Sequence, residues 1–154
     1  MSLLNRLFQK LNPSLTKDNG EVKTSGELIA EVADGANRVE GKQTWELAEE
    51  KRDDIEYMKR CCDAELKTMA VAGIVSAPYY FERVAILSRK QKNYRQEVEY
   101  CELYINSVES YYKMGNTEHE ADVRKGSRYK AIVARLPKAK KLLASKGIAL
   151  PMRE

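Results

Sequence analysis

The chain has 154 residues, of which 43% are hydrophobic and 32% charged, a balance typical of one globular domain with a sizeable core. Only 4 prolines and 8 glycines stand among many helix-forming residues, which favours an all-α bundle of five or six helices. Three cysteines, an odd number, exclude a disulfide scaffold, and the lack of a long apolar run excludes integral membrane insertion, so we expect a cytoplasmic protein; the net charge of +4 is mild and by itself indicates no class of partner.

Residues 1–13 are predicted to form an amphipathic helix that ends at Asn12-Pro13. Its apolar face begins at Leu3 and carries four candidate contact residues, namely Leu4, Leu7, Phe8 and Leu11. One interpretation is a helix that docks on the chain's own core or on a second copy of the protein. The other is a helix that binds a partner protein or a membrane surface. The segment is short and has only two basic residues before the proline, which disfavours the membrane.

Residues 14–43 are predicted to be a linker with a short turn and a short helix. Asn19-Gly20 is a strong signal for a two-residue hairpin turn, and we expect no sheet beyond a short hairpin there. Thr24 and Glu27 have the spacing of a capping box at the start of the short helix. Glycines interrupt the remainder, so we expect loose order up to Gly41.

Residues 44–150 are predicted to form the helical domain. Thr44 has the chemistry of an N-cap for a long helix that continues toward Met69. One face of this helix is apolar and comprises Trp45, Ala48, Ile55, Met58, Cys62, Leu66 and Met69. Small apolar residues then fill positions 69–77, which indicates a buried helix end and a tight corner at Gly73.

Residues 78–112 are predicted to be two helices that fold back on each other at Lys92-Asn93. Pro78 suits the first position of a helix. The second helix has the clearest apolar stripe in the sequence, formed by Tyr94, Val98, Cys101, Ile105, Val108 and Tyr112.

This hairpin resembles one tetratricopeptide-type unit over about a quarter of the chain. The resemblance is carried by Phe81, Val84, Ala85, Tyr94, Val98 and Cys101. Ser88 and Glu97 depart from the pattern, which usually has an aromatic and an alanine at these positions. The resemblance implies a helical surface that holds peptides or partner proteins.

A further helix is predicted after a capping box at Thr117 and Glu120. Its apolar face comprises Tyr129, Ile132, Leu136, Ala139 and Leu143, and Pro137 either kinks the helix or opens a new one. For the whole domain we predict a core that contains Ile55, Val84, Val98, Cys101, Ile105, Leu136 and Leu143.

Basic residues are concentrated in the C-terminal part of the chain. Between Val123 and Leu150 there are nine Lys and Arg and no acidic residue, whereas residues 46–65 hold eight acidic residues and four basic ones. In one interpretation the basic helix packs near the acidic helix, and the charges complement each other or face solvent. In the other they bind nucleic acid or an acidic partner. The candidate surface residues are Arg89, Lys90, Lys92, Arg95, Arg124, Arg128, Arg135, Lys138 and Lys141.

No pattern in the sequence indicates catalysis. His119 is the single histidine and lies between two glutamates, the cysteines lack zinc spacing, and no phosphate-binding glycine motif occurs. We therefore expect no enzyme, cofactor or metal. The leading hypothesis is a small module that binds another protein as an adaptor, inhibitor or assembly factor. The alternatives are a nucleic-acid-binding protein that uses the basic helix and a structural subunit of a homo-oligomer.

Overall fold

The computed structural model describes residues 14–115 and 121–146. Several predicted features lie outside these residues: the N-terminal helix with Leu4, Leu7, Phe8 and Leu11, the capping box at Thr117 and Glu120, and His119.

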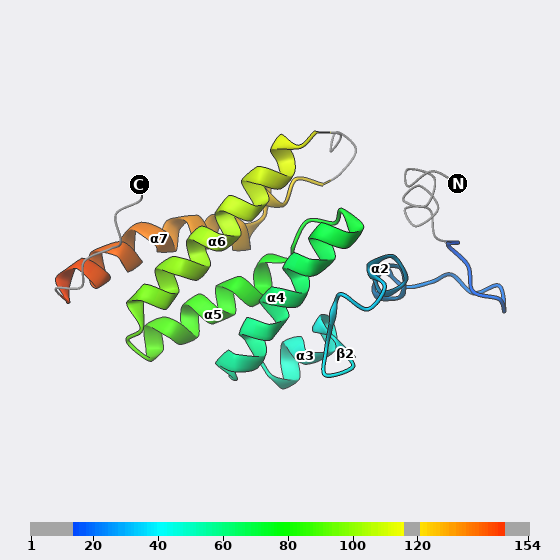
Figure 1. The fold of residues 1–154 in the computed structure, drawn as a ribbon, viewed down its shortest axis with the longest axis horizontal. Coiled ribbons are helices and arrows are strands. Elements are labelled where there is room, and N and C mark those ends of the chain that lie inside the picture. The colour runs from blue at the N-terminus through cyan, green and yellow to red at the C-terminus, as the bar shows by residue number, and fades with distance from the viewer. Residues whose placement is uncertain (1–13, 116–120, 147–154) are drawn as a thin grey trace.

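Six α-helices lie in the described residues and confirm the all-α prediction (Figure 1). They are α2 Ser25–Ala33, α3 Thr44–Glu50, α4 Ile55–Ala72, α5 Pro78–Lys90, α6 Tyr94–Lys113 and α7 Ser127–Ser145. A short 3-10 turn, η1, spans Val123–Lys125. From α4 onward, each helix packs against the next, and α7 contacts both α5 and α6. The α5–α6 hairpin is therefore central: α4 packs against its first helix, and α7 packs against both of its helices.

The predicted helical hairpin is confirmed. Pro78 occupies the first turn of α5, where its missing N–H costs no hydrogen bond. Asn93 caps α6, because its side-chain oxygen accepts a hydrogen bond from the backbone N–H of Gln96 at 3.1 Å. Between the two helices, Lys92 adopts a left-handed backbone conformation with φ 58°.

The core is continuous from α4 through α5 and α6 to α7. Four of the seven predicted core residues are buried, namely Val84, Val98, Cys101 and Leu143. The other three, Ile55, Ile105 and Leu136, are half-buried at its edge. On α6, Tyr104 is fully buried, whereas its neighbour Ile105 is not. Its ring packs against Phe81 with centroids 4.7 Å apart, and its hydroxyl donates to the backbone carbonyl of Ser76 at 2.9 Å.

The prediction of one long helix from Thr44 to Met69 is wrong. The chain leaves the helix after Glu50 and starts α4 at Ile55. Asp54 causes the restart, since its carboxylate accepts hydrogen bonds from the backbone N–H groups of Glu56 and Tyr57. Thr44 is the first residue of α3 and not its cap, and its hydroxyl donates to Glu65 at 2.8 Å. Trp45 is 57% exposed, so it does not belong to the core.

Residues 14–43 contain more structure than the predicted linker. An isolated bridge pairs Thr16 with Val22 around the expected turn. The two-stranded sheet of the described residues lies elsewhere, because β1 Arg38–Val39 pairs with β2 Lys42–Gln43 around Gly41. Three hydrophobic residues of this segment, Val32, Ala33 and Val39, are buried, and so is Asn37.

The last described helix, α7, runs through Pro137 without interruption, so of the two alternatives predicted for Pro137 the opening of a new helix is wrong. Tyr129, Ile132, Ala139 and Leu143 face the core as the pattern predicts. Gly73 ends α4 with φ 64°, a left-handed conformation that glycine adopts without steric cost.

Candidate interaction surface

A fully buried carboxylate joins α5, α6 and α7. Glu97, in the first turn of α6, is 0% exposed. Arg89 from α5 donates through Nε to its Oε2 at 3.1 Å, and Arg135 from α7 donates through Nη1 to its Oε1 at 2.9 Å. A second guanidinium nitrogen of Arg89, Nη2, lies 2.8 Å from Oε1. Two of the nine candidate cations are therefore bound to one internal anion.

Two more candidate cations, Arg128 and Arg124, are paired within the chain. Arg128 donates to Glu82 at 2.7 Å, and its guanidinium lies 4.9 Å from the ring centre of Tyr79. These contacts fix the N-terminal half of α7 on α5, because both partners belong to α5.

Arg124 is held just before α7. It donates to both carboxylate oxygens of Asp122 at 2.9 Å and to Glu109 at 3.3 Å, and it stacks 4.4 Å from the ring centre of Tyr112. The hydrogen bond from Arg124 lowers the pKa of the Asp122 carboxyl group. Tyr129 donates to the other oxygen of Glu109 at 2.9 Å, so Glu109 ties α6 to both η1 and α7.

The other five candidate cations have exposed side chains and form no ion pair with any described residue. They are Lys90, Lys92, Arg95, Lys138 and Lys141. The structure thus divides the predicted surface into four arginines that bind carboxylates of the chain and five cations that face solvent. The complementary acids come from α5, α6 and Asp122, and not from the acidic segment 46–65 that one interpretation proposed.

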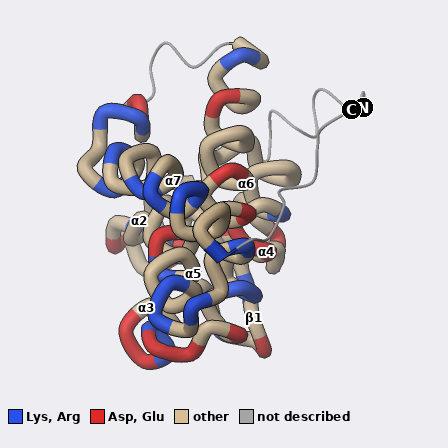
Figure 2. The backbone as a smooth tube through the Cα atoms, turned by 90° about the vertical axis from the view of Figure 1, so that its left-hand side faces the viewer, with Lys and Arg blue, Asp and Glu red and all other residues tan. Residues whose placement is uncertain are grey.

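Side chains of α5 also reach α3 and the segment that follows it. The hydroxyl of Tyr79 donates to the backbone carbonyl of Ala48 at 2.8 Å. Arg83 donates to the carbonyl of Arg52 at 3.0 Å and to the carboxylate of Asp53 at 2.7 Å. We call the surface that contains Asp53, Tyr79, Glu82, Arg83 and Arg128 the α3–α5–α7 face. Figure 2 views these three helices from the front, with basic residues along α7 and acidic residues around α3.

Most of the residues that build this face were missed in the sequence. Tyr79, Glu82 and Arg83 follow Pro78 in a helix whose outward side carried no recognisable motif. Glu97, which joins α5, α6 and α7, carried a signal, because a charged residue stands where the tetratricopeptide-type pattern usually has an alanine. A charge in such a position requires partners, and two of the candidate arginines are these partners.

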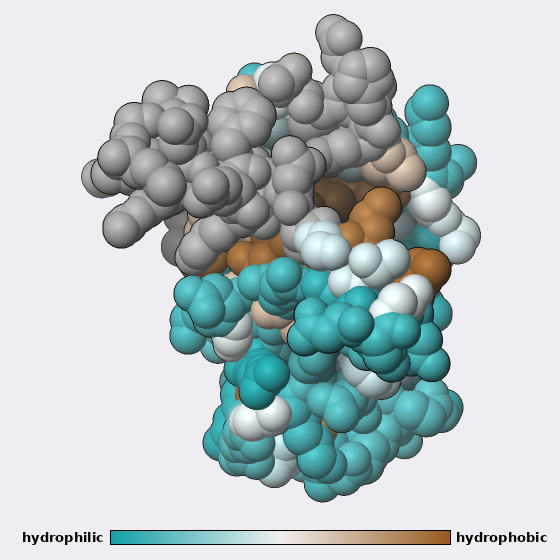
Figure 3. Space-filling view, turned by 90° about the vertical axis from the view of Figure 1, so that its right-hand side faces the viewer, coloured by the Kyte–Doolittle hydropathy of each residue, from teal (hydrophilic) through white to brown (hydrophobic). Residues whose placement is uncertain are grey.

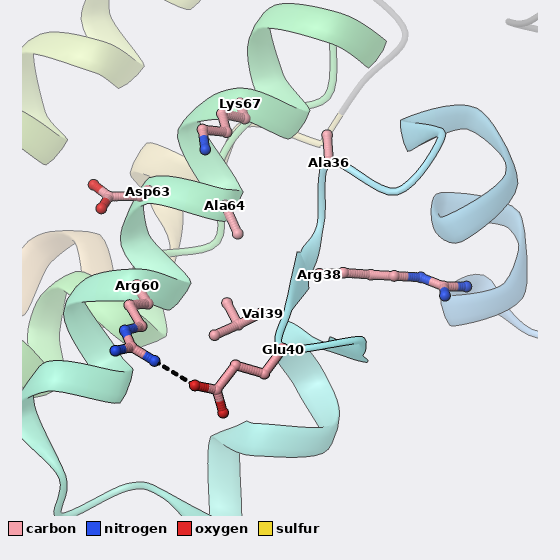
Figure 4. A pocket seen from close by; sticks show the side chains of 8 residues that line it. All are labelled: Ala36, Arg38, Val39, Glu40, Arg60, Asp63, Ala64 and Lys67. Carbon is pink, nitrogen blue, oxygen red and sulfur yellow. Dashed lines mark hydrogen bonds and ion pairs between the residues drawn. The ribbon is translucent and has the colours of Figure 1, made fainter.

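A small open pocket of about 230 Å³ lies between β1 and α4. Its lining includes Arg38, Glu40, Arg60, Asp63 and Lys67, and the close-up in Figure 4 shows Arg38 pointing away from it toward α2. Glu40 accepts hydrogen bonds from Tyr57 at 2.7 Å and Arg60 at 2.6 Å, and these bonds lower the pKa of its carboxyl group. Because Glu40 and Arg60 already neutralise each other, this pocket is a weak candidate for a charged ligand.

The opposite side of the molecule has apolar surface. Figure 3 shows apolar residues in the upper half of this side and a hydrophilic lower half. Over the described chain, the exposed large apolar residues are Leu15, Val22, Trp45, Val71, Leu103, Met114 and Val133. They are spread over the N-terminal turn, α3, α4, α6 and α7, so they do not follow one helix face.

The three cysteines are free and buried. Burial raises the pKa of Cys61 and of Cys101 to about 12 and raises that of Cys62 as well, so all three thiols are protonated at neutral pH. In residues 14–115 and 121–146, no three His, Cys, Asp or Glu side chains are grouped to hold a metal ion. Among the helices described, none is long and apolar enough to cross a membrane.

No protein family model, no curated protein and no solved structure matches this chain. The function therefore has to be argued from the residues of the surface itself.

Proposed function

We propose that the chain is a small helical interaction module, acting as an adaptor, inhibitor or assembly factor, and that it binds a partner protein on the α3–α5–α7 face. The observation that carries the proposal is the position of α5. Tyr79 ties it to α3 and Arg83 ties it to the segment just after α3, while Tyr79 and Glu82 hold Arg128 of α7. Three helices from distant parts of the sequence thereby form one continuous surface.

The chemistry of this face suits a protein ligand. Tyr79 is half-buried on this face and offers apolar contact area, and Arg83 and Arg128 lie on the same face, with the guanidinium group of Arg128 next to the ring of Tyr79. Tyrosine and arginine are the residues most enriched at protein–protein interfaces. The basic side along α7 and the acidic side around α3 would orient a partner with the opposite arrangement of charges (Figure 2).

The resemblance of the α5–α6 hairpin to a tetratricopeptide-type unit supports the same proposal, because such units hold peptides and partner proteins on a surface of helices. In this chain α7 packs on both helices of the hairpin and would extend that surface.

The proposal is tested by site-specific photo-crosslinking in cells. A photoreactive amino acid is placed at Ala131, which is exposed on α7 one turn from both Arg128 and Arg135. The matched control carries it at Asn106, which is exposed on α6. We expect a defined heterologous protein to be crosslinked from position 131 and not from position 106.

Crosslinks of equal yield from both positions, or none from position 131, would contradict the proposed face. Crosslinks from position 131 to a second copy of the chain would contradict the binding of a different protein and favour the homo-oligomer. Crosslinking to nucleic acid alone, abolished by nuclease, would also contradict it.

A further inference from the structure

We infer that the end of the bundle where α5 and α6 join binds the phosphate backbone of duplex nucleic acid, a function beyond the protein binding proposed above. We call this region the cationic end and define it by five residues. Lys90, Lys92 and Arg95 lie at the α5–α6 junction, and Lys138 and Lys141 lie on α7.

Two sets of contacts bring these cations to one place. Arg89 and Arg135 both bind Glu97, so the end of α5 and the middle of α7 lie within two side-chain lengths of each other. Lys90 directly follows Arg89, and Lys138 is one helical turn beyond Arg135.

The second set of contacts is apolar. Tyr94 and Val98 at the start of α6 pack against Ala139 and Leu143 of α7. Arg95 follows Tyr94, and Lys141 lies between Ala139 and Leu143 in sequence, so both belong to the same end of the molecule.

The charge of this region is not neutralised by the residues that the structure describes. Glu97 is already bound by two arginines, and Glu102 is bound by Lys140 at 2.8 Å. Glu99, one turn after Arg95, is the exposed carboxylate nearest to it along α6, and it forms no ion pair with any described residue. Five solvent-facing cations therefore stand against one such carboxylate, which leaves a local excess of positive charge.

The type of cation favours phosphates over carboxylates. Arginines, whose planar fork matches a carboxylate, are used internally on Glu82, Glu97 and Asp122. Four of the five solvent-facing cations are lysines, which act as point charges on flexible stems. Such groups suit contacts to a phosphate backbone that do not depend on the base sequence.

The surroundings favour a duplex over a single strand. Proteins that bind single strands usually stack the bases on exposed aromatic side chains. The aromatic residue next to the cationic end is Tyr94, which is half-buried against Val98 and Leu143. A duplex offers its phosphates on the outside and needs no such platform.

The inference is tested with the purified full chain and a fluorescently labelled 20-base-pair duplex of mixed sequence. Binding is measured by anisotropy at several salt concentrations. If all five cations contact phosphates, the slope of log affinity against log salt is about −4.5, and the affinity falls about 500-fold between 50 and 200 mM salt. In the triple variant K90Q/K138Q/K141Q we expect a slope of about −1.8.

The matched control is K67Q/K113Q/K125Q, which removes the same charge from exposed lysines outside the cationic end. We expect it to keep the wild-type slope. An equal loss in both variants would show a response to net charge alone and would overturn the inference. It would also be overturned if the wild-type chain failed to bind the duplex at 50 mM salt, or bound a polyglutamate peptide through these lysines and not the duplex. Circular dichroism of the variants, which alter only exposed residues, separates loss of binding from loss of fold.

Discussion

Arg135 on α7 donates a 2.9 Å hydrogen bond to Glu97 on α6, across 38 residues of sequence, and the accepting carboxylate is fully buried. Arg89 completes the site from α5. A buried anion is stabilising only when its lone pairs are occupied, and here two guanidinium groups occupy them. Gln96 extends the polar cluster, because its amide donates to the hydroxyl of Ser88 at 2.8 Å. The cluster joins α7 to both helices of the hairpin, because Glu97 of α6 binds Arg89 of α5 and Arg135 of α7.

Replacing Glu97 is therefore expected to destabilise the fold. The substitution Glu97→Gln removes the charge that two arginines share, and it leaves them partly buried without a counterion, since Arg135 is 21% exposed and Arg89 33%. We expect the free energy of unfolding to fall by about 3 kcal/mol, as measured by urea denaturation. The control Glu99→Gln alters an exposed carboxylate on the same helix and should change stability by less than about 0.5 kcal/mol.

A second variant separates the loss of stability caused by removing the carboxylate from the loss caused by leaving the two arginines unpaired. In the triple variant E97L/R89L/R135L the buried charges are replaced together by apolar side chains of comparable reach. We expect it to recover most of the stability lost in Glu97→Gln. A triple variant less stable than Glu97→Gln would contradict the account of Glu97 as the shared counterion.

Stability is expected to fall at alkaline pH. Burial raises the pKa of Cys61 and Cys101 to about 12, whereas a thiol in an unfolded chain titrates near 8.5. Above pH 8.5 the unfolded state releases thiol protons that the native state retains, so the free energy of unfolding decreases as pH rises toward 12. At pH 10 the loss is about 2 kcal/mol for each buried thiol.

Urea denaturation at pH 7, 8.5 and 10 measures this dependence. The variant C61A/C101A lacks two of the buried thiols and should show a shallower decrease with pH, whatever its absolute stability. An equal or rising stability between pH 8.5 and 10 in the wild-type chain would contradict the burial of the thiols.

Local signals in the sequence were enough to predict the central hairpin. Pro78 and Asn93 mark the starts of α5 and α6 by their own backbone chemistry, and the stripe through Val98 and Cys101 follows the helical period. The break between α3 and α4 was missed because Asp54 lies among charged residues that also suit an exposed helix surface. Asp54 can cap α4 only because α3 has already ended at Glu50. The position of α3 depends in turn on the packing of Leu47 into the core, which is a tertiary contact.

The candidate surface was predicted only in part, and for a different reason. Sequence position identified the nine cations but not their partners, since Arg128 and Glu82 are separated by 46 residues and Arg135 and Glu97 by 38. Such pairs are set by the packing of α7 on the hairpin, which no local pattern encodes. The same packing rotates α6 so that Tyr104, instead of Ile105, faces the centre of the core.

This rotation of α6 has a measurable consequence. Tyr104 is fully buried between Phe81 and Tyr129, whereas Ile105 is half-buried at the core edge. We expect Tyr104→Ala to lower the free energy of unfolding by about 4 kcal/mol and Ile105→Ala by about 1.5 kcal/mol. Tyr104→Phe removes the hydrogen bond to Ser76 alone and should cost about 1 kcal/mol. A larger loss in Ile105→Ala than in Tyr104→Ala would contradict the observed orientation of α6.

The turn between α5 and α6 offers a substitution with opposite effects on stability and on binding. Lys92 has φ 58°, a conformation that costs an L-residue about 1–2 kcal/mol and glycine very little. After the greater freedom of glycine in the unfolded chain is subtracted, which costs about 0.5–1 kcal/mol, Lys92→Gly should raise the free energy of unfolding by about 0.5–1 kcal/mol, as measured by urea denaturation. Its loss of one solvent-facing cation should at the same time make the salt slope of duplex binding shallower by about 0.9.

The neighbouring residue provides the control for both effects. Gln91 has φ −81°, so Gln91→Gly brings only the greater freedom of glycine in the unfolded chain and should lower stability by about 0.5–1 kcal/mol. It removes no charge, and the salt slope should stay at its wild-type value. If Lys92→Gly destabilised the chain as Gln91→Gly does, the left-handed turn would be contradicted. If Lys92→Gly stabilised the chain but left the salt slope of duplex binding unchanged, the side chain of Lys92 would have no part in binding and would not belong to the cationic end.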